Sequence, residues 1–252
     1  MSKWYDKGQL LSYKAYFNML IGNRGGGKTY GFKTWCIDDF IKNNKQFVWI
    51  RRYGTEIDEM KKTFFDDIAS KYPGYKFAIK GNKKSGKIYV DKKVAGYYFA
   101  LTTSSIAKSS SYPGVDKIVF DEFLIIGNTY RYLNDEVVLL LEFMETIFRD
   151  REHEPKAVKP RGVYLLGNNV TIANPYFLYF NVRPFKQRFY HDKNRGILVE
   201  QFTNKEFVEA KKQSMIGKLT ANTTYAEYSI ENKSYLDNDR FNPLNAIYNV
   251  NS

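Results

Sequence analysis

The sequence predicts an α/β fold with a mostly parallel, twisted sheet, a hairpin insertion and a small C-terminal linker subdomain. Apolar runs rich in β-branched and aromatic residues alternate with segments of helical periodicity, a pattern typical of a parallel sheet covered by helices on both faces. A glycine-rich turn follows the first apolar run, and a later apolar run ends in two acidic residues. The 252 residues, of which 43% are hydrophobic, suffice for one large domain with its own core.

The first half of the chain supplies two strand–helix units and the insertion. Tyr16–Ile21 has the apolar character of a buried strand, and apolar residues recur at helical spacing from Thr29 to about Ile41. Gln46–Arg52 is rich in β-branched and aromatic residues and predicts a second strand, and Glu56–Lys71 predicts a second helix. Short strands joined by polar turns then predict a hairpin insertion from Phe77 to Leu101.

The second half of the chain supplies two more core strands, Lys117–Phe120 and Val163–Leu166, with an amphipathic helix between them. This helix is predicted from Asn134, a good N-cap residue, to about Arg151. Beyond residue 199 the pattern becomes shorter and more polar. We therefore expect a sheet domain over 1–199 and a linker or small subdomain over 200–252.

The glycine-rich turn fits the P-loop (Walker A) pattern G-x-x-x-x-G-K-[ST] without mismatch. Its residues are Gly22, Asn23, Arg24, Gly25, Gly26, Gly27, Lys28 and Thr29. The glycines allow backbone N–H groups to turn toward phosphate oxygens, while Lys28 reaches the β- and γ-phosphates and the Thr29 hydroxyl binds Mg²⁺. Arg24 can turn toward the phosphates or pair with a carboxylate. The alternative, a flexible glycine turn, does not account for the position of this motif between a strand and a helix.

The apolar run Ile118–Phe120 ends in Asp121 and Glu122, as a Walker B motif does. Asp121 is expected to hold Mg²⁺ through water, and Glu122 to orient or deprotonate the attacking water. Strands often end in acidic residues, and a solvated turn residue is the alternative for Glu122. After a complete P-loop, the pair predicts an ATPase of the P-loop subclass that carries its own catalytic glutamate (ASCE, RecA-like), with ATP and Mg²⁺ as cofactors.

Three further polar residues each have two interpretations. Asn168 follows the strand Val163–Leu166, and in this subclass an extra strand lies between the P-loop strand and the Asp-Glu strand, so Asn168 is expected either to contact the nucleophilic water or to serve the turn. Arg149 ends the amphipathic helix, where it suits the negative end of the helix dipole or an arginine finger offered to a neighbouring subunit. Lys108, in the polar loop Thr102–Pro113, has the same two interpretations.

The charge of the chain points to a polyanionic partner. The formal net charge is +12, an excess that favours nucleic acid or membrane headgroups. The longest strongly apolar stretch, Val137–Leu141, is too short to span a bilayer, so we expect a cytosolic protein with no membrane partner. Lysines crowd the insertion and the helix before it, where they suit sequence-independent contact with phosphates or merely a solvated surface. They are Lys61, Lys62, Lys76, Lys80, Lys83, Lys84, Lys87, Lys92 and Lys93.

From about Gln9 to about Asp237 the chain resembles the genome-packaging (DNA-encapsidation) ATPases of small short-tailed phages. The tracts that carry the resemblance are Gln46–Tyr53, Lys108–Pro113, Ile118–Phe123, Phe148–Glu152, Asn168–Phe177 and Tyr225–Asn232. The resemblance implies a homomeric ring, expected to be a pentamer, that docks on the portal of a prohead and drives double-stranded DNA inward. It also implies that Arg149 is the trans-acting finger and Lys108 a second trans-acting basic residue.

The resemblance carries further expectations about partners and domains. We expect the protein in the host cytoplasm and transiently on the prohead, in some relatives together with a structural RNA. Some family members carry a C-terminal nuclease-like domain; about twenty residues follow Asn232 in the given sequence, so we expect this domain to be absent, divergent or outside that sequence. Two alternatives stay open at this point: another ring ATPase of the same subclass, such as a helicase or DNA-transfer motor, and a nucleotide-gated assembly scaffold.

Overall fold

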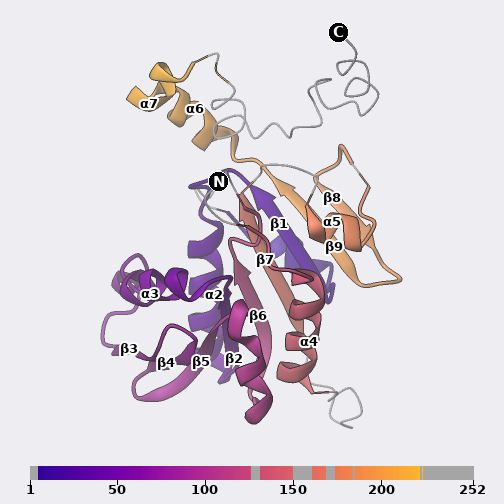
Figure 1. The fold of residues 1–252 in the computed structure, drawn as a ribbon. Coiled ribbons are helices and arrows are strands. Elements are labelled where there is room, and N and C mark those ends of the chain that lie inside the picture. Colours follow the sequence, from indigo (N-terminus) through magenta and orange to yellow (C-terminus); the bar gives the residue numbers. More distant parts are fainter. Residues whose placement is uncertain are drawn as a thin grey trace.

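The computed structural model describes residues 5–125, 131–149, 161–168, 174–183, 185–221 and 223. Its centre is a nine-stranded sheet in the order β3-β4-β5-β2-β6-β7-β1-β9-β8 (Figure 1). The strands are β1 (Phe17–Gly22), β2 (Gln46–Arg51), β3 (Phe77–Gly81), β4 (Ser85–Val90), β5 (Lys93–Ala100), β6 (Val115–Asp121), β7 (Gly162–Asn168), β8 (Phe189–Asp192) and β9 (Ile197–Phe202). The run from β5 to β9 through β2, β6, β7 and β1 is parallel throughout, which confirms the predicted fold class.

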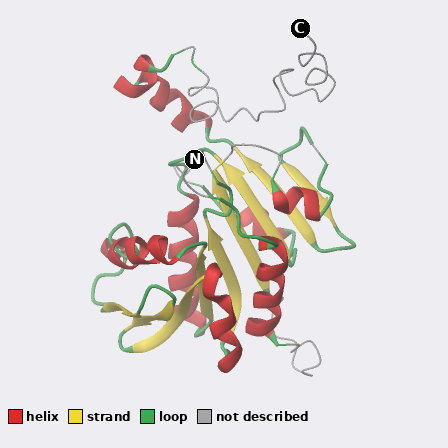
Figure 2. Ribbon diagram, in the orientation of Figure 1, coloured by secondary structure: helices red, strands yellow, loops and turns green. Residues whose placement is uncertain are grey.

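Helices cover both faces of the sheet (Figure 2). They are α1 (Gly8–Ser12), α2 (Lys28–Asn43), α3 (Gly54–Thr63), α4 (Glu136–Phe148), α5 (Pro175–Tyr179), α6 (Lys205–Gln213) and α7 (Met215–Leu219), with 3-10 segments η1 (Ala69–Lys71) and η2 (Leu101–Ser109). The side chains of α4, α5 and η2 share one core cluster, and those of α1, α2 and α3 share the other. Within the described residues no helix combines the length and apolar character that a membrane span requires.

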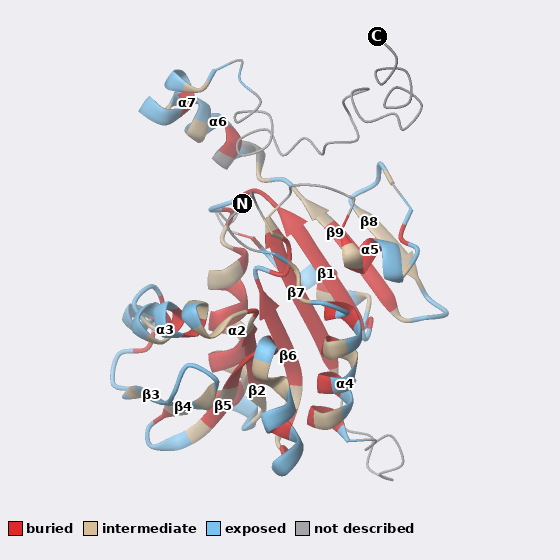
Figure 3. Cartoon of the chain, viewed as in Figure 1, coloured by how far each residue is buried: buried red, intermediate tan, exposed pale blue. Residues whose placement is uncertain are grey.

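The central strands feed the two clusters alternately. In β2, Val48 and Ile50 belong to one cluster and Phe47 and Trp49 to the other, because successive side chains of a strand point to opposite faces. All four of these side chains are fully buried. Figure 3 shows the buried residues concentrated along the middle of the sheet. This two-sided burial explains why the core strands read as unbroken apolar runs.

The helix predicted over Glu56–Lys71 is shorter in the structure, because α3 ends at Thr63. Phe64 and Ile68 nevertheless remain fully buried, so the periodic spacing of the apolar residues reported burial correctly. Phe65 stacks on Phe77 of β3 at 4.5 Å between ring centroids. The α-helix therefore ends at Thr63, where the chain turns toward β3.

The predicted insertion is partly a piece of the main sheet. β3 and β4 form an antiparallel hairpin, as expected, but β5 pairs in parallel with β2 and therefore belongs to the central sheet. The predicted N-cap, Asn134, is displaced by Asp135, whose side chain makes no capping bond. Glu136, the first residue of α4, instead accepts a hydrogen bond from the backbone N–H of Leu133 (2.9 Å).

The last two strands were not predicted. β9 lies beside the P-loop strand β1 in parallel register, and β8 pairs with β9 as the edge. The predicted division after residue 199 falls inside β9; the division into two domains stays a prediction. Glu200 gave this segment a polar appearance, although it is fully buried and accepts hydrogen bonds from the hydroxyl of Tyr5 and the guanidinium of Arg188.

Candidate nucleotide site

The predicted catalytic and phosphate-binding residues, apart from Arg149 and Lys108, meet at the carboxyl ends of β1, β6 and β7. All of them except Gly22 and Asn23 line a cavity of about 220 Å³. Its lining consists of Arg24, Gly25, Gly26, Gly27, Lys28, Thr29, Tyr30, Asp121, Glu122, Leu166, Gly167 and Asn168. The carboxyl edge of a parallel sheet is where open α/β folds bind ligands.

Strand order explains why Asn168 lies at this cavity. β7 is inserted between β6, which ends in Asp121, and β1, which ends in Gly22, as predicted for the subclass. In register, Gly22 pairs with Asn168 and Asp121 with Leu166. The Asn168 side chain accepts a hydrogen bond from Lys28 Nζ at 3.3 Å. Asn168 therefore lies beside the lysine that is expected to contact the terminal phosphates.

The glycines of the P-loop are required by its shape. Gly25 and Gly27 have φ of 82° and 85°, in the left-handed region where glycine is favoured. A Cβ on Gly22 would lie 2.4 Å from the carbonyl oxygen of Phe202, so the end of β9 closes one side of the loop. The loop thus keeps its curve, with α2 starting at Lys28 directly after it.

Lys28 is buried and is bound by the loop itself. Its Nζ donates to the carbonyl oxygens of Gly22 (2.8 Å) and Asn23 (2.7 Å). Burial lowers the pKa of Lys28 to about 8, although the nearby carboxylate of Asp121 acts in the opposite direction. The ammonium thus lacks a close carboxylate partner in these contacts and is suited to an anionic ligand such as a phosphate.

Thr29 and Asp121 offer the oxygen ligands that Mg²⁺ prefers. The Thr29 hydroxyl donates to Asp121 Oδ1 at 3.0 Å. Burial raises the pKa of Asp121, while Arg51 and the Thr29 hydrogen bond lower it. A hydroxyl and a carboxylate facing each other at a P-loop fit a magnesium ion that also contacts phosphate oxygens.

Glu122 has a special backbone conformation and an unexpected partner. Its φ is 62°, so the chain turns sharply after β6 and leaves the carboxylate 54% exposed at the cavity. Nη1 of Arg51 lies 3.1 Å from Glu122 Oε2 and 3.5 Å from Asp121 Oδ2. Arg51 was not among the site residues predicted from the sequence. Its signal was a cation at the end of an apolar strand that is next to β6 in the sheet.

Arg149 and Lys108 lie together but outside this cavity. Arg149 is the C-cap residue of α4, and its Nη2 donates to the carbonyl oxygens of Lys108 (3.0 Å) and Ser110 (2.8 Å). Nζ of Lys108 is 3.6 Å from the exposed carboxylate of Glu142. The 13 residues of α4 span about 20 Å, and the helix begins at Glu136, close to the turn that carries Glu122. Arg149 is therefore too far away to reach the cavity of its own chain.

Comparison with known proteins identifies the family. The sequence family described as Podovirus DNA encapsidation protein (Gp16) matches residues 1–244. The chain belongs to this podovirus DNA encapsidation family. It is 35% identical over 243 residues to the DNA packaging protein of Bacillus phage phi29, covering 95% of this chain and 68% of that protein. The DNA packaging protein of Bacillus phage B103 is 36% identical over 233 residues, covering 92% of this chain and 68% of that protein.

Solved structures of encapsidation proteins have the same fold. The crystal structure of the N-terminal domain of the DNA packaging ATPase from bacteriophage phi29 matches with a TM-score of 0.70 and 37% identity, covering 80% of this chain and 97% of that one. A structure of the bacteriophage phi29 viral genome packaging motor assembly matches with a TM-score of 0.68 and 34% identity, covering 92% of this chain and 67% of that one.

Several lysines of the encapsidation protein lie together at the β3 edge of the sheet. Those of the β3–β4 hairpin are exposed, namely Lys76, Lys80, Lys83, Lys84 and Lys87. Lys61 of α3 donates to the carbonyl oxygen of Gly81, so α3 and the hairpin form one continuous surface. The described geometry leaves both earlier interpretations of these lysines open, DNA contact and solvated surface.

Proposed function

We propose that this podovirus DNA encapsidation protein hydrolyses ATP to drive double-stranded DNA into a viral prohead. One observation carries the proposal: Lys28, Thr29, Asp121, Glu122 and Asn168 converge on one cavity beside a P-loop. Together they supply phosphate binding, a magnesium site, a base and a polar group near the γ-phosphate. The names of the relatives, which are DNA packaging proteins, support the use of this chemistry in a motor.

In the proposed reaction the P-loop backbone and Lys28 bind the phosphates of ATP. Thr29 and Asp121 would hold Mg²⁺, which would supply positive charge for phosphoryl transfer. Glu122 accepts a proton from water as the water oxygen attacks the γ-phosphorus. The bond from the γ-phosphorus to the bridging oxygen breaks, leaving ADP and inorganic phosphate. Asn168 hydrogen-bonds the same water or the γ-phosphate and so reports whether that phosphate is present.

The proposal includes a ring, expected to be a pentamer on the portal of the prohead. Arg149 and Lys108 support it, because they lie beyond reach of their own cavity and on an exposed surface. Phosphoryl transfer develops charge that a neighbouring arginine can stabilise. The similar phi29 structure is a viral genome packaging motor assembly, which supports assembly of several components. The +12 net charge supports the DNA partner. A structural RNA, as in some relatives, would use the same charge.

Two variants test the chemistry separately. Lys28→Ala should weaken ATP binding, since Lys28 contacts ground-state phosphate, whereas Glu122→Gln should bind ATP normally and lose nearly all turnover. Nucleotide affinity and phosphate release are measured for both. Normal turnover in Glu122→Gln would remove Glu122 from its catalytic role, and absence of hydrolysis in the wild type under all conditions would favour the assembly scaffold.

A packaging assay separates the motor from its enzymatic alternatives. Proheads with portals should stimulate hydrolysis by the wild type and take up double-stranded DNA, which becomes protected from nuclease. A helicase would instead separate strands of a forked duplex. Strand separation without prohead stimulation would favour the helicase or DNA-transfer alternative.

A further inference from the structure

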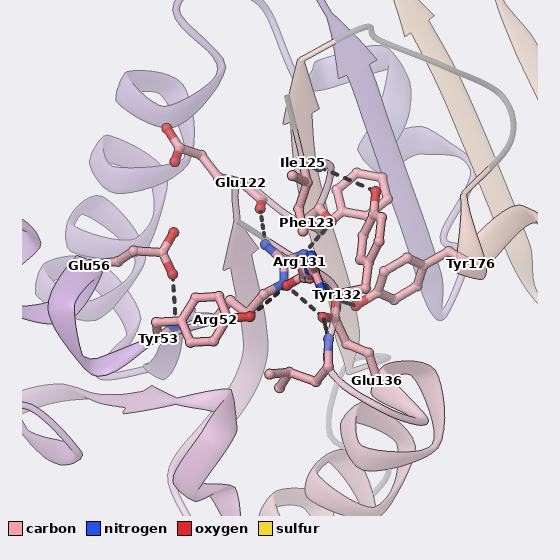
Figure 4. A network of polar contacts seen from close by, with 11 residues as sticks. Arg52, Tyr53, Glu56, Glu122, Phe123, Ile125, Arg131, Tyr132, Glu136 and Tyr176 are labelled. Carbon is pink, nitrogen blue, oxygen red and sulfur yellow. Dashed lines mark hydrogen bonds and ion pairs between the residues drawn. The ribbon is translucent and has the colours of Figure 1, made fainter. Parts of the chain in front are cut away.

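A buried ion pair lies directly behind the turn that carries Glu122 (Figure 4). Arg52, the residue after β2, donates from Nε to Glu136 Oε2 at 2.7 Å and from Nη2 to Oε1 at 2.9 Å. The two side chains are 2% and 0% exposed. A bidentate pair of this kind fixes the direction of the guanidinium plane.

The same guanidinium binds the backbone of the turn. Nη1 of Arg52 donates to the carbonyl oxygen of Glu122 (3.2 Å), and Nη2 donates to that of Phe123 (2.6 Å). Glu122 has a φ of 62°, a left-handed conformation that is unfavourable for a residue with a β-carbon. Such a conformation persists only where its surroundings specify it. Arg52 supplies that specification from the buried side of the turn.

Three further contacts hold Arg52 and its partner Glu136 in place. The Tyr176 hydroxyl of α5 donates to Glu136 Oε1 at 2.7 Å, and burial keeps the pKa of Tyr176 well above its ordinary value, so the hydroxyl remains a donor. The Leu133 N–H donates to Glu136 Oε2 at 2.9 Å. The ring of Tyr132 lies 5.1 Å from the guanidinium carbon. The contacts join β2, the Glu122 turn, α4 and α5 into one buried unit.

We propose that Arg52 is a positioning residue for hydrolysis, holding the Glu122 turn through its two carbonyl oxygens while Glu136 and Tyr176 hold Arg52. The proposal rests on the proposed ATPase function. The role of Arg52 differs from that of Arg51, because Arg51 binds the carboxylate of Glu122 and not its backbone. Arg52 is not a lining residue of the nucleotide cavity. Its loss is therefore expected to change turnover and to leave nucleotide affinity intact.

Stability and positioning can be separated by removing both charges of the pair. Removal of one partner leaves a buried charge without compensation and is strongly destabilising. Replacement of both partners by uncharged residues of similar volume is often neutral or stabilising. In Arg52→Met/Glu136→Gln the new amide still offers an acceptor to the Leu133 N–H and a donor to the Tyr176 oxygen. Lys117→Met is the matched control. Lys117 is also a buried cation, with a side chain 3% exposed, and it pairs with Asp39 and Asp116. It lies near the start of β6, whereas the Glu122 turn follows the end of that strand.

The readouts are Tm, ATP affinity and kcat measured well below Tm. For the double variant we expect a Tm near that of the wild type, an unchanged Kd for ATP and a kcat lowered by about 10–100-fold. The control should lower Tm and leave kcat unchanged. Wild-type kcat in the double variant, or a loss of kcat that follows Tm in both variants, would overturn the proposal. Neither result touches the ATPase assignment, which fails only if the wild type does not hydrolyse ATP.

Discussion

Arg51 and Glu122 form an ion pair across the carboxyl ends of two adjacent strands, with 3.1 Å between Nη1 and Oε2. The carboxylate that is expected to activate water is thus bound by a cation of its own subunit. A carboxylate has two acceptor oxygens, so Oε1 of Glu122 can take a proton from water while Oε2 keeps its contact with Arg51. Arg51 also lies near Asp121, so the same guanidinium influences both the base and the magnesium ligand.

Removal of Arg51 should make magnesium binding sensitive to pH. Burial raises the pKa of Asp121, and Arg51 is the main charge that opposes the rise. In Arg51→Met the pKa of Asp121 should rise further, and a protonated carboxyl cannot ligate Mg²⁺. In titrations near pH 6 and about pH 8.5, the deficit of Arg51→Met in magnesium-dependent nucleotide affinity, relative to the wild type at the same pH, should therefore be larger at the lower pH. Arg195→Met, which removes an exposed cation paired with Asp192, is the control; an equal deficit at both pH values would contradict the prediction.

ATP binding should take up protons near pH 8. Burial lowers the pKa of Lys28 to about 8, and arriving phosphates should raise it again. At a pH between the pKa of Lys28 in the free protein and its higher pKa in the complex, Lys28 is partly deprotonated in the free protein and protonated in the complex. ATP affinity should therefore fall as pH rises past about 8. Calorimetry in buffers with different ionisation enthalpies measures the uptake. Lys28→Met should show none of it; uptake of the same size in that variant would assign the proton to another group.

The depressed pKa of Lys28 also has a consequence for stability. An ordinary lysine in the unfolded chain keeps its proton to higher pH than Lys28 does in the fold. The unfolded state therefore binds more protons above about pH 8, and the Lys28 contribution to the free energy of unfolding should increase with pH in that range. The free energy of unfolding is measured with denaturant for the wild type and Lys28→Met at about pH 7.5 and about pH 9.5. The value for the wild type minus that for the variant should be larger at the higher pH.

Mixed rings should restore hydrolysis if Arg149 acts in trans. Arg149→Ala and Glu122→Gln should each bind ATP and hydrolyse poorly, since arginine fingers are worth about 10³–10⁵ in rate. A mixture should regain activity, because some interfaces pair an intact Glu122 with an intact Arg149 of the next subunit. Inactivity of every mixture, with mixed rings demonstrated by cross-linking, would leave Arg149 as the cap that binds the carbonyl oxygens of Lys108 and Ser110.

DNA affinity should depend on salt and on the lysines of the hairpin. Each phosphate contact contributes about 0.9 to the slope of log affinity against log salt on duplex DNA. If Lys83, Lys84 and Lys87 touch DNA, their joint change to alanine should reduce that slope for unrelated duplexes alike. Lys14, Lys42 and Lys193, which are also exposed, provide a charge-matched triple control. Equal slopes in the two triple variants would support the solvated-surface interpretation.

The fold and most of the site could be predicted because they depend on local patterns. A P-loop between a strand and a helix specifies where Lys28 and Thr29 lie, and an apolar run ending in Asp121 and Glu122 specifies the neighbouring edge. Prediction of Asn168 needed one assumption, that its strand lies between the other two, and the sheet order confirms it.

What the sequence did not reveal depends on contacts between distant segments. Arg51 and Arg52 are neighbours with equal charge, yet one faces the carboxylate of Glu122 and the other its backbone. Glu136 appeared to be an ordinary acidic residue in the first turn of a helix, but it is buried by Arg52 and Tyr176. Likewise, Glu200 made the sequence of β9 look too polar for a buried strand, because its partners Tyr5 and Arg188 are distant or unrecognisable in the sequence. A buried charge can be recognised only with its partner, and sequence periodicity does not name partners.

The two edges of the open sheet also bear on how copies of this chain meet. β3, at one edge, is a strand of five residues that ends beside exposed lysines, and β8, at the other edge, has four residues. Long flat edges invite strand pairing between molecules, and head-to-tail pairing that does not close on itself produces open fibres. Short edges and the positive charge of Lys80 and its neighbours discourage such pairing. We therefore expect the lysine-rich hairpin to disfavour aggregation, whether or not it also touches DNA.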